Sequence, residues 1–254
     1  MKKIIAIAAA ILGTVSVASA ADLAVKTRPY VGPAPVFTWT GCYVGVHAGA
    51  GVMHDQGFQA QGNISTEPFD RHGVGGLAGG QIGCNYQTGM LVLGIEGEGY
   101  WSGMRIHVDQ FEGNTPFVNT TIKNRWDYDV AARIGVAFDR ALVYGKAGWT
   151  AGRFEWNSAF VNFCGNFCST NQGSATLDGL LIGVGLEYAF LNNWTAKFEY
   201  DYLGFGAKNV TFSAFCANCI TSTFTQNVSA DKHIFKVGLN YLFNVGGPAV
   251  VAKY

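Results

Sequence analysis

The chain has 254 residues, and its 17 basic and 17 acidic residues give a formal net charge of zero. Charged residues make up only 13% of the chain, which is about half the share of an ordinary soluble domain. With 14% aromatic residues, this composition excludes a disordered chain, and it offers no basic surface for nucleic acid. The 34 glycines favour β-structure, because glycine costs about 1 kcal/mol at a helical position.

The first twenty residues have the pattern of a cleaved secretory signal. Lys2 and Lys3 precede an apolar run over residues 4–17, and the small residues Ala-Ser-Ala follow. Because the run is shorter than the ~20 residues of a spanning helix, we expect cleavage after residue 20 and not a membrane anchor. Residues 21–39 contain three prolines, which predict an extended periplasmic tether leading into the fold.

From residue 40 onward, apolar and polar residues alternate in eight stretches, each long enough to cross a bilayer as a β-strand. The links after the second, fourth and sixth stretches are short, whereas the others have roughly 20 residues, an asymmetry typical of outer-membrane barrels. The expected strands are Thr40–Val52, Gly75–Tyr86, Met90–Ser102, Arg125–Phe138, Ala141–Phe154, Leu177–Phe190, Trp194–Gly206 and Asp231–Phe243.

These features predict an all-β fold, an eight-stranded antiparallel up-and-down transmembrane β-barrel with long extracellular loops and short periplasmic turns. The barrel and a short C-terminal tail, residues 244–254, together occupy residues 40–254. The sheet has to close because lipid offers no partner for the backbone groups of an open edge. A soluble lipocalin-like barrel, with an apolar interior, also alternates and is an alternative. Aromatic residues near strand ends on the apolar face would form an interfacial girdle: Tyr86, Trp101, Phe138, Tyr188 and Trp194.

The polar face of the expected strands carries charged residues that would point into the barrel. Eight strands leave an interior just wide enough for side chains to fill, and unpaired buried charges are costly. We therefore predict a narrow or plugged lumen with a buried ion network of Glu96, Glu98, Asp129, Arg133, Lys146, Glu187, Lys197, Glu199 and Lys236. Acid–base catalysis by Glu96 and Glu98 is the alternative, but no pattern of a substrate cleft accompanies the pair.

Six segments resemble, in this order, a family of small outer-membrane proteins of alphaproteobacteria, the porin-like surface-antigen and haemin-binding family: Phe37 to Gly45, Gly79 to Tyr86, Arg133 to Gly135, Ala137 to Arg140, Trp194 to Tyr200 and Val237 to Phe243. The resemblance implies a transmembrane barrel of the outer-membrane protein A type in the Gram-negative outer membrane. It also implies that the barrel assembly machinery recognises the last strand. Cys42 and Cys84 depart from the family, which more often has aromatic residues there.

The six cysteines form three local pairs. Cys42 and Cys84 would meet on one face at the periplasmic rim, where the geometry allows a cross-strand bridge. The other four fall in the third and fourth long loops: Cys164, Cys168, Cys216 and Cys219. Export favours disulfides over a four-cysteine zinc site, but the connectivity stays open.

The expected function is that of a structural, surface-exposed outer-membrane barrel of the porin family, with no catalytic residue, cofactor or metal. Its expected partners are outer-membrane lipid, the barrel assembly machinery and a surface ligand of the long loops. One alternative is a lipid-modifying enzyme, although the sequence shows no convincing Ser–His–acid group. The other is a haemin-binding surface receptor, as the resemblance implies, with haem ligated by His54, His72 and His107.

Overall fold

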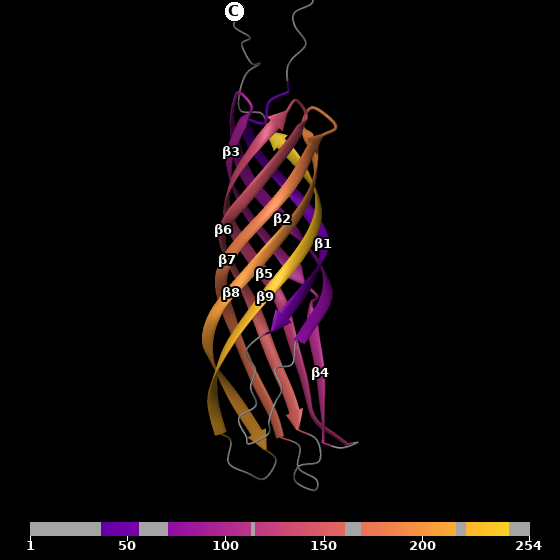
Figure 1. Cartoon of the computed structure of the whole chain (residues 1–254), viewed down its shortest axis with the longest axis vertical. Coiled ribbons are helices and arrows are strands. Elements are labelled where there is room, and N and C mark those ends of the chain that lie inside the picture. The colour runs from indigo at the N-terminus through magenta and orange to yellow at the C-terminus, as the bar shows by residue number, and fades with distance from the viewer. Residues whose placement is uncertain (1–36, 56–70, 113–114, 161–168, 217–221, 244–254) are drawn as a thin grey trace, which may run out of the picture. The chain divides into compact units, whose positions relative to one another are not determined.

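A computed structural model (Figure 1) describes residues 37–55, 71–112, 115–160, 169–216 and 222–243 of the chain. In this described part, the segments with alternating apolar and polar residues form nine β-strands. The expected signal peptide (1–20), all but the last three residues of the expected tether (21–39) and the tail after residue 243 lie outside the described residues. No helix in the described part is long and apolar enough to span a membrane. The strands are β1 (Gly41–Asp55), β2 (Arg71–Thr88), β3 (Leu91–Ser102), β4 (Arg105–Glu112), β5 (Thr115–Phe138), β6 (Ala141–Phe160), β7 (Ser169–Ala189), β8 (Trp194–Cys216) and β9 (Ser222–Phe243).

The sheet closes into a ring through antiparallel pairs. The order around the ring is β1-β2-β3-β5-β6-β7-β8-β9, and β1 pairs with β9 from Cys42↔Phe243 to Asp55↔Ala230. β3 pairs with β2 on one side and with β5 on the other. β4 continues the line of β3 and pairs with the first part of β5. The eight expected strands are therefore eight passes along the barrel, the third of which is divided into β3 and β4.

Short turns join β2 to β3, β5 to β6 and β7 to β8 at one end of the barrel, the upper end in Figure 1. Gly89 and Asp139 have φ values of 60° and 53° in the first two of these turns, and tight hairpin turns require this left-handed conformation. At the other end the strands continue past their expected bounds. β5 begins at Thr115 and not at Arg125, and β8 ends at Cys216 and not at Gly206.

The strand segments next to the short turns carry apolar side chains outward and polar side chains inward. Val46, Ile95 and Val184, for example, are 63%, 66% and 59% exposed on the outer surface. An apolar outer surface that continues around the ring is suited to contact with lipid. These segments are named the membrane zone and comprise residues 41–52, 74–88, 91–102, 126–138, 141–149, 180–189, 194–202 and 235–243.

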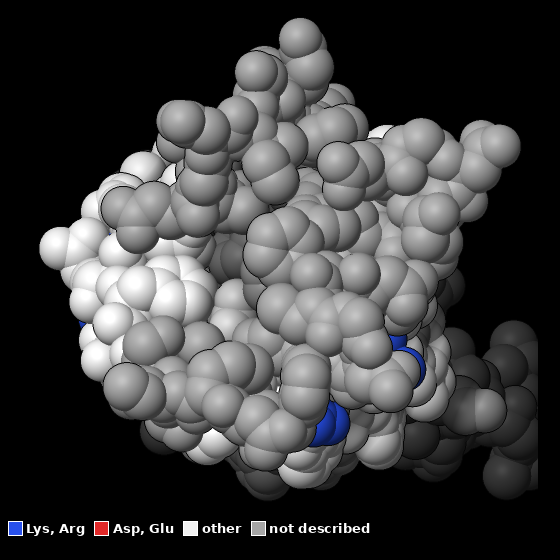
Figure 2. Space-filling view, turned by 90° about the horizontal axis from the view of Figure 1, so that it is seen from below, with Lys and Arg blue, Asp and Glu red and all other residues white. Residues whose placement is uncertain are grey.

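Beyond the membrane zone the outer surface carries polar side chains and the inner surface carries mainly apolar side chains. Trp156 and Phe212 are buried inside the barrel, whereas Arg125 and Lys208 lie on its outer surface. An antiparallel sheet with water on one side has polar residues on that face and apolar residues on the packed face. The segments beyond the membrane zone, which were expected to be loops, have this pattern and form strands. Basic side chains are visible at the rim when the barrel is seen from this end (Figure 2). These segments are named the outer zone and comprise residues 53–55, 71–73, 104–112, 115–125, 150–160, 169–179, 203–216 and 222–234.

Irregular pairing marks the boundary between the two zones in β5 and β8. The register shifts between Asn124 and Trp126 in β5, and between Phe205 and Lys208 in β8. An extra residue in one strand reverses which positions face inward. In β5, for example, Ile122 and Asp127 are both buried although they are five positions apart, an odd spacing that would place them on opposite faces of a regular strand.

Candidate functional site: the barrel interior

Residues that precede β1 close the interior at the short-turn end. Trp39 is 1% exposed and packs in an apolar cluster with Leu142 and the partly buried Phe37. Its Nε1 donates a hydrogen bond to the backbone oxygen of Asp139 (3.2 Å), and its backbone N–H donates to Oε1 of Gln87 (2.8 Å). The last residues of the expected tether are therefore part of the barrel packing, and they are named the apolar plug.

Arg133 occupies the layer next to the apolar plug. Its guanidinium donates to Oε2 of Glu187 (2.8 Å), to Oε2 of Glu96 (3.2 Å) and to the hydroxyl of Tyr43. The hydroxyl of Tyr43 in turn donates to Glu96 Oε2 (2.6 Å), and the guanidinium carbon lies 3.9 Å from the centre of the Tyr144 ring. All five side chains are buried. The positive charge is thus matched by two carboxylates and two aromatic faces.

Two glycines make room for these tyrosines. A Cβ atom at Gly83 would collide with the ring and hydroxyl of Tyr43, and one at Gly185 would collide with the ring of Tyr144. Both glycines lie on the inward face of the wall, where a side chain is otherwise expected. The glycine content of the chain therefore has a local reason here: it lets large rings lie across a narrow interior.

Three lysines and two glutamates form the next layer. Glu98 accepts from Lys197 (2.7 Å), from Lys146 (3.1 Å) and from Lys236. Glu199 lies 2.7 Å from Lys146, 2.9 Å from Lys236 and 3.5 Å from Lys197. None of the five side chains is more than 1% exposed. Because every charge has several partners, the layer tolerates burial that isolated charges would not.

The carboxylates of Glu96, Glu98 and Glu199 offer oxygen atoms within 4.8 Å of one another, a spacing that could hold a metal ion. Lysine ammonium groups already bind these oxygens: Lys146 and Lys197 contact all three carboxylates. A metal ion would have to displace these cations. The cluster is therefore chemically an ion-pair network, and the apolar plug separates it from the short-turn end.

The structure places all nine residues of the expected network inside the barrel and links eight of them by ion pairs. Asp129 is buried, but no ion pair joins it to another residue of the described part. Sequence reasoning missed Asp201, which lies 2.6 Å from Lys236, and the buried pair Lys232–Asp127 (2.5 Å). A signal for Asp201 was present, since it follows Glu199 by two residues and so shares its face.

The interior of the outer zone holds mainly apolar side chains, with a few buried polar residues such as Thr120 and Ser158 among them. Lys232 marks the transition, with its ammonium 4.8 Å from the ring centres of both Phe154 and Phe205. Beyond it, Phe154 stacks on Trp156 (5.9 Å between ring centres), and Trp156 meets the edge of Phe212 (6.0 Å). These rings belong to one buried cluster with residues from every strand. The ionic layers of the barrel interior thus lie between two apolar layers, and the buried hydroxyls of Thr120 and Ser158 lie beyond the outer one.

The five residues of the expected girdle all lie on the outer surface of the membrane zone, each at least 42% exposed: Tyr86, Trp101, Phe138, Tyr188 and Trp194. Further aromatic residues extend the ring at the boundary with the outer zone. Trp126 stacks on Tyr128, and Tyr128 meets the edge of Trp149. Rings at both borders of an apolar surface are the arrangement found where a barrel meets the two interfaces of a bilayer.

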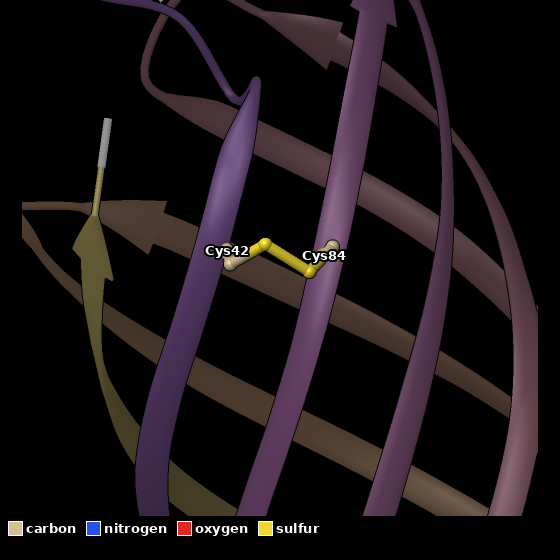
Figure 3. The surroundings of a disulfide bond; sticks show 2 residues. All are labelled: Cys42 and Cys84. Atoms are coloured by element: carbon tan, nitrogen blue, oxygen red, sulfur yellow. A yellow bond between two sulfur atoms is a disulfide. The ribbon is translucent and has the colours of Figure 1, made fainter. Parts of the chain in front are cut away.

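Cys42 and Cys84 are joined by a disulfide between the neighbouring strands β1 and β2 (Figure 3). The bridge lies on the outward face, near the end of the barrel that carries the short turns. The side chains of the other four cysteines lie outside the described part of the chain: Cys164, Cys168, Cys216 and Cys219. Their pairing stays a prediction.

The histidines expected to ligate haem lie on different strands. His54 of β1 and His72 of β2 are opposite each other, with ring centres 6.3 Å apart. His107 lies on β4, where its ring contacts the side chains of Thr121 (3.1 Å) and Asn119 (3.3 Å). Haem ligation by these residues stays a prediction.

The sequence profile of the family described as outer membrane protein beta-barrel domain matches residues 7–243. The chain belongs to this family. The expected outer-membrane location and the resemblance to small alphaproteobacterial outer-membrane proteins are thereby confirmed, and the soluble barrel is wrong, because the outer surface of the membrane zone is apolar.

Relatives match along most of the chain. This chain is 31% identical over 252 residues to a 31 kDa outer-membrane immunogenic protein of Brucella melitensis biotype 1, and the match covers 94% of this chain and 98% of the relative. A 25 kDa outer-membrane immunogenic protein of the same organism is 25% identical over 246 residues, covering 96% and 99%. A 22 kDa outer membrane protein of Rhizobium leguminosarum bv. viciae is 30% identical over 177 residues, covering 69% and 68%.

Two solved structures are similar in fold. One is the outer membrane protein OprG from Pseudomonas aeruginosa, with 11% identity, a TM-score of 0.47, and coverage of 82% of this chain and 99% of that chain. The other is a major outer membrane protein from Thermus thermophilus, with 12% identity, a TM-score of 0.49, and coverage of 80% and 99%.

Proposed function

We propose that the protein is a closed, structural barrel of the outer membrane that presents its outer zone and long connections at the cell surface, and that it neither conducts solutes nor catalyses a reaction. The observation that carries the proposal is the filled interior. The apolar plug at Trp39, the ion network around Glu98 and the apolar cluster around Trp156 follow one another along the barrel.

Conduction would require each of these layers to open. A path past Arg133 would separate it from Glu96 and Glu187, whose side chains are at most 3% exposed. Leaving one partner of a buried ion pair without the other costs about 3–5 kcal/mol. The apolar cluster of the outer zone would have to be displaced as well. These costs support a closed resting state.

Planar-bilayer recording of the refolded full chain tests the closed barrel. We expect no stable conductance steps from this protein, whereas a general porin reconstituted in the same lipid serves as the positive control. The variant Trp39→Ala disrupts the apolar plug alone. It should show no stable conductance steps either, because the ion network and the apolar cluster of the outer zone still fill the interior. Large and stable steps from the unmodified protein would contradict the proposal.

Surface presentation is supported by the polar outer wall of the outer zone. Arg125 pairs with Glu155 across this wall (2.8 Å), and both side chains are at least 30% exposed. The Brucella relatives are named outer-membrane immunogenic proteins. The short turns lie at the opposite end of the barrel, and short turns are periplasmic in outer-membrane barrels, which favours an orientation in which the outer zone points away from the cell.

Epitope insertion tests this orientation. A short epitope placed in the connection of residues 56–70, between β1 and β2, should be recognised by antibody on intact cells. The matched control carries the same epitope between Asp139 and Arg140 in the short turn from β5 to β6, and it should be recognised only after the outer membrane is permeabilised. The opposite pattern would overturn the orientation.

A further inference from the structure

Three histidines and an aspartate gather on the outward face of three neighbouring strands, where the membrane zone meets the outer zone. His54 on β1 lies opposite His72 on β2 and opposite Asp231 on β9. His233 follows Asp231 by two residues and therefore lies on the same face of β9. The ring centres of His54 and His233 are 6.0 Å apart. This cluster plays no part in sealing the interior.

The carboxylate of Asp231 lies between two imidazole nitrogens. Its Oδ2 is 3.7 Å from Nδ1 of His54 and 3.7 Å from Nε2 of His233. In a tetrahedral zinc site with metal–ligand distances of about 2.0–2.2 Å, two donor atoms lie about 3.3 Å apart. The carboxylate is therefore within about 0.4 Å of ligand spacing from each imidazole, and the two imidazoles, whose ring centres are 6.0 Å apart, would have to turn toward each other to complete the site.

Tyr200 orients one of the imidazoles. Its hydroxyl lies 2.7 Å from Nδ1 of His233, and the two rings are stacked with 23° between their planes. When Nδ1–H donates to this hydroxyl, the lone pair of His233 is on Nε2, the atom that faces Asp231. Metal-binding histidines are commonly held in this way by a hydrogen bond at the other ring nitrogen.

The cluster is partly covered and still reachable. The side chain of Asp231 is 13% exposed, whereas those of His54 and His233 are 35% and 39% exposed. An ion can therefore reach the donors from solvent without unfolding of the wall. Partial burial of the carboxylate also lowers the local dielectric constant and strengthens its attraction for a cation.

We propose that His54, Asp231 and His233 bind a divalent transition-metal ion of the Zn²⁺ type at the outer edge of the membrane zone. Two imidazoles and one carboxylate are suited to such an ion, whereas Ca²⁺ and Mg²⁺ prefer oxygen ligands alone. His72 lies beside this site, with its ring centre 6.3 Å from that of His54.

Calorimetric titration of the refolded full chain in detergent with ZnCl₂ tests the site. We expect one ion per chain. Tyr200→Phe should weaken binding about 10–100-fold, as is typical when the hydrogen bond that orients a ligand is lost. His54→Ala and His233→Ala remove ligands and should weaken binding at least as much. His107→Ala is the matched control, an exposed histidine outside the cluster, and should bind like the unmodified protein.

Electron paramagnetic resonance with Cu²⁺ as the probe identifies the donor atoms. We expect hyperfine coupling to imidazole nitrogen in the unmodified protein and its reduction in His233→Ala, while heat-modifiable gel mobility shows that the variant is folded. Absence of zinc binding at micromolar concentrations would overturn the proposal. So would a copper spectrum without nitrogen coupling, or equal losses of binding in His54→Ala and His107→Ala.

Discussion

The membrane zone and the outer zone are built from the same strands but have opposite faces. In the membrane zone, Val184 points outward while Lys236 is buried inside; in the outer zone, Lys208 points outward while Trp156 is buried inside. The backbone pairing continues through both zones, so the difference lies in the surroundings. Lipid favours an apolar wall and leaves the polar residues to the interior, whereas water favours the reverse.

This comparison shows that one β-barrel can be stabilised in two ways along its length. The interior of the membrane zone depends on matched charges, each of which is costly without its partners. The interior of the outer zone depends on burial of apolar surface, as in a soluble domain. Substitutions in the two zones should therefore have different consequences, and the following four predictions test this, from the largest expected effect to the smallest.

Lys236→Met should lower the free energy of unfolding by about 3–5 kcal/mol, because it removes one of the two lysines, Lys236 and Lys146, that contact Glu98, Glu199 and Asp201, and leaves these buried carboxylates with too little matching positive charge. Urea unfolding in phospholipid vesicles, followed by tryptophan fluorescence, measures the loss. Adding Asp201→Asn to Lys236→Met should restore part of the stability, since one unmatched carboxylate is then removed. Equal stability of Lys236→Met and the unmodified protein would show that the ion network does not stabilise the membrane zone.

Val184→Lys places a charge on the lipid-facing surface and should cost about 2–4 kcal/mol if the site lies near the bilayer midplane. Thr211→Lys places the same charge on the outward face of the outer zone and should be nearly neutral. The same vesicle unfolding measurement compares the two variants. If both cost the same, the boundary between the zones is misplaced.

Ile106→Val removes one methylene from the buried apolar cluster of the outer zone and should cost about 0.5–1.5 kcal/mol. Ile95→Val makes the same change on the lipid-facing surface, where Ile95 is 66% exposed. Lipid chains can fill the space there, so this control should cost less. A larger loss for Ile95→Val than for Ile106→Val would indicate that the outer zone lacks a packed core.

Lys208→Ala should change the free energy of unfolding by less than about 1 kcal/mol. Lys208 pairs with Asp178 at 3.7 Å, but their side chains are 49% and 64% exposed, so water and salt already screen the charges. The contrast with Lys236→Met compares an exposed ion pair with a buried one. A loss as large as that of Lys236→Met would contradict the assignment of this wall to water.

The membrane zone could be predicted from the sequence because the outward residues are apolar or glycine along nearly the whole of each strand there, while the charged residues of these segments all face inward. The outer zone could not, because this arrangement reverses where it begins. In β5 and β8 an inserted residue near Asn124 and near Phe205 also breaks the period of two. Where the apolar residues move from the outward to the inward face and an extra residue interrupts the alternation, the sequence looks as if the strand ends.

The ion network was predictable as a set of inward residues, but its pairing was not. Glu98 and Lys236 lie 138 residues apart in the chain, and only closure of the ring brings them together. The apolar plug escaped prediction for another reason. Trp39 follows a proline-containing segment without alternation, and nothing in its neighbours indicates that its ring turns into the barrel.

The covalent link between Cys42 and Cys84 has a consequence for strand alignment. β1 and β2 are rich in glycine, and strands with few side chains define their mutual alignment weakly. A slip of one strand by a single position would turn its side chains to the opposite face of the sheet. Val44 and Val46 would then face the ionic interior, and His47 would face the lipid. Once it has formed, the disulfide between Cys42 and Cys84 fixes the alignment of β1 with β2 and prevents that slip.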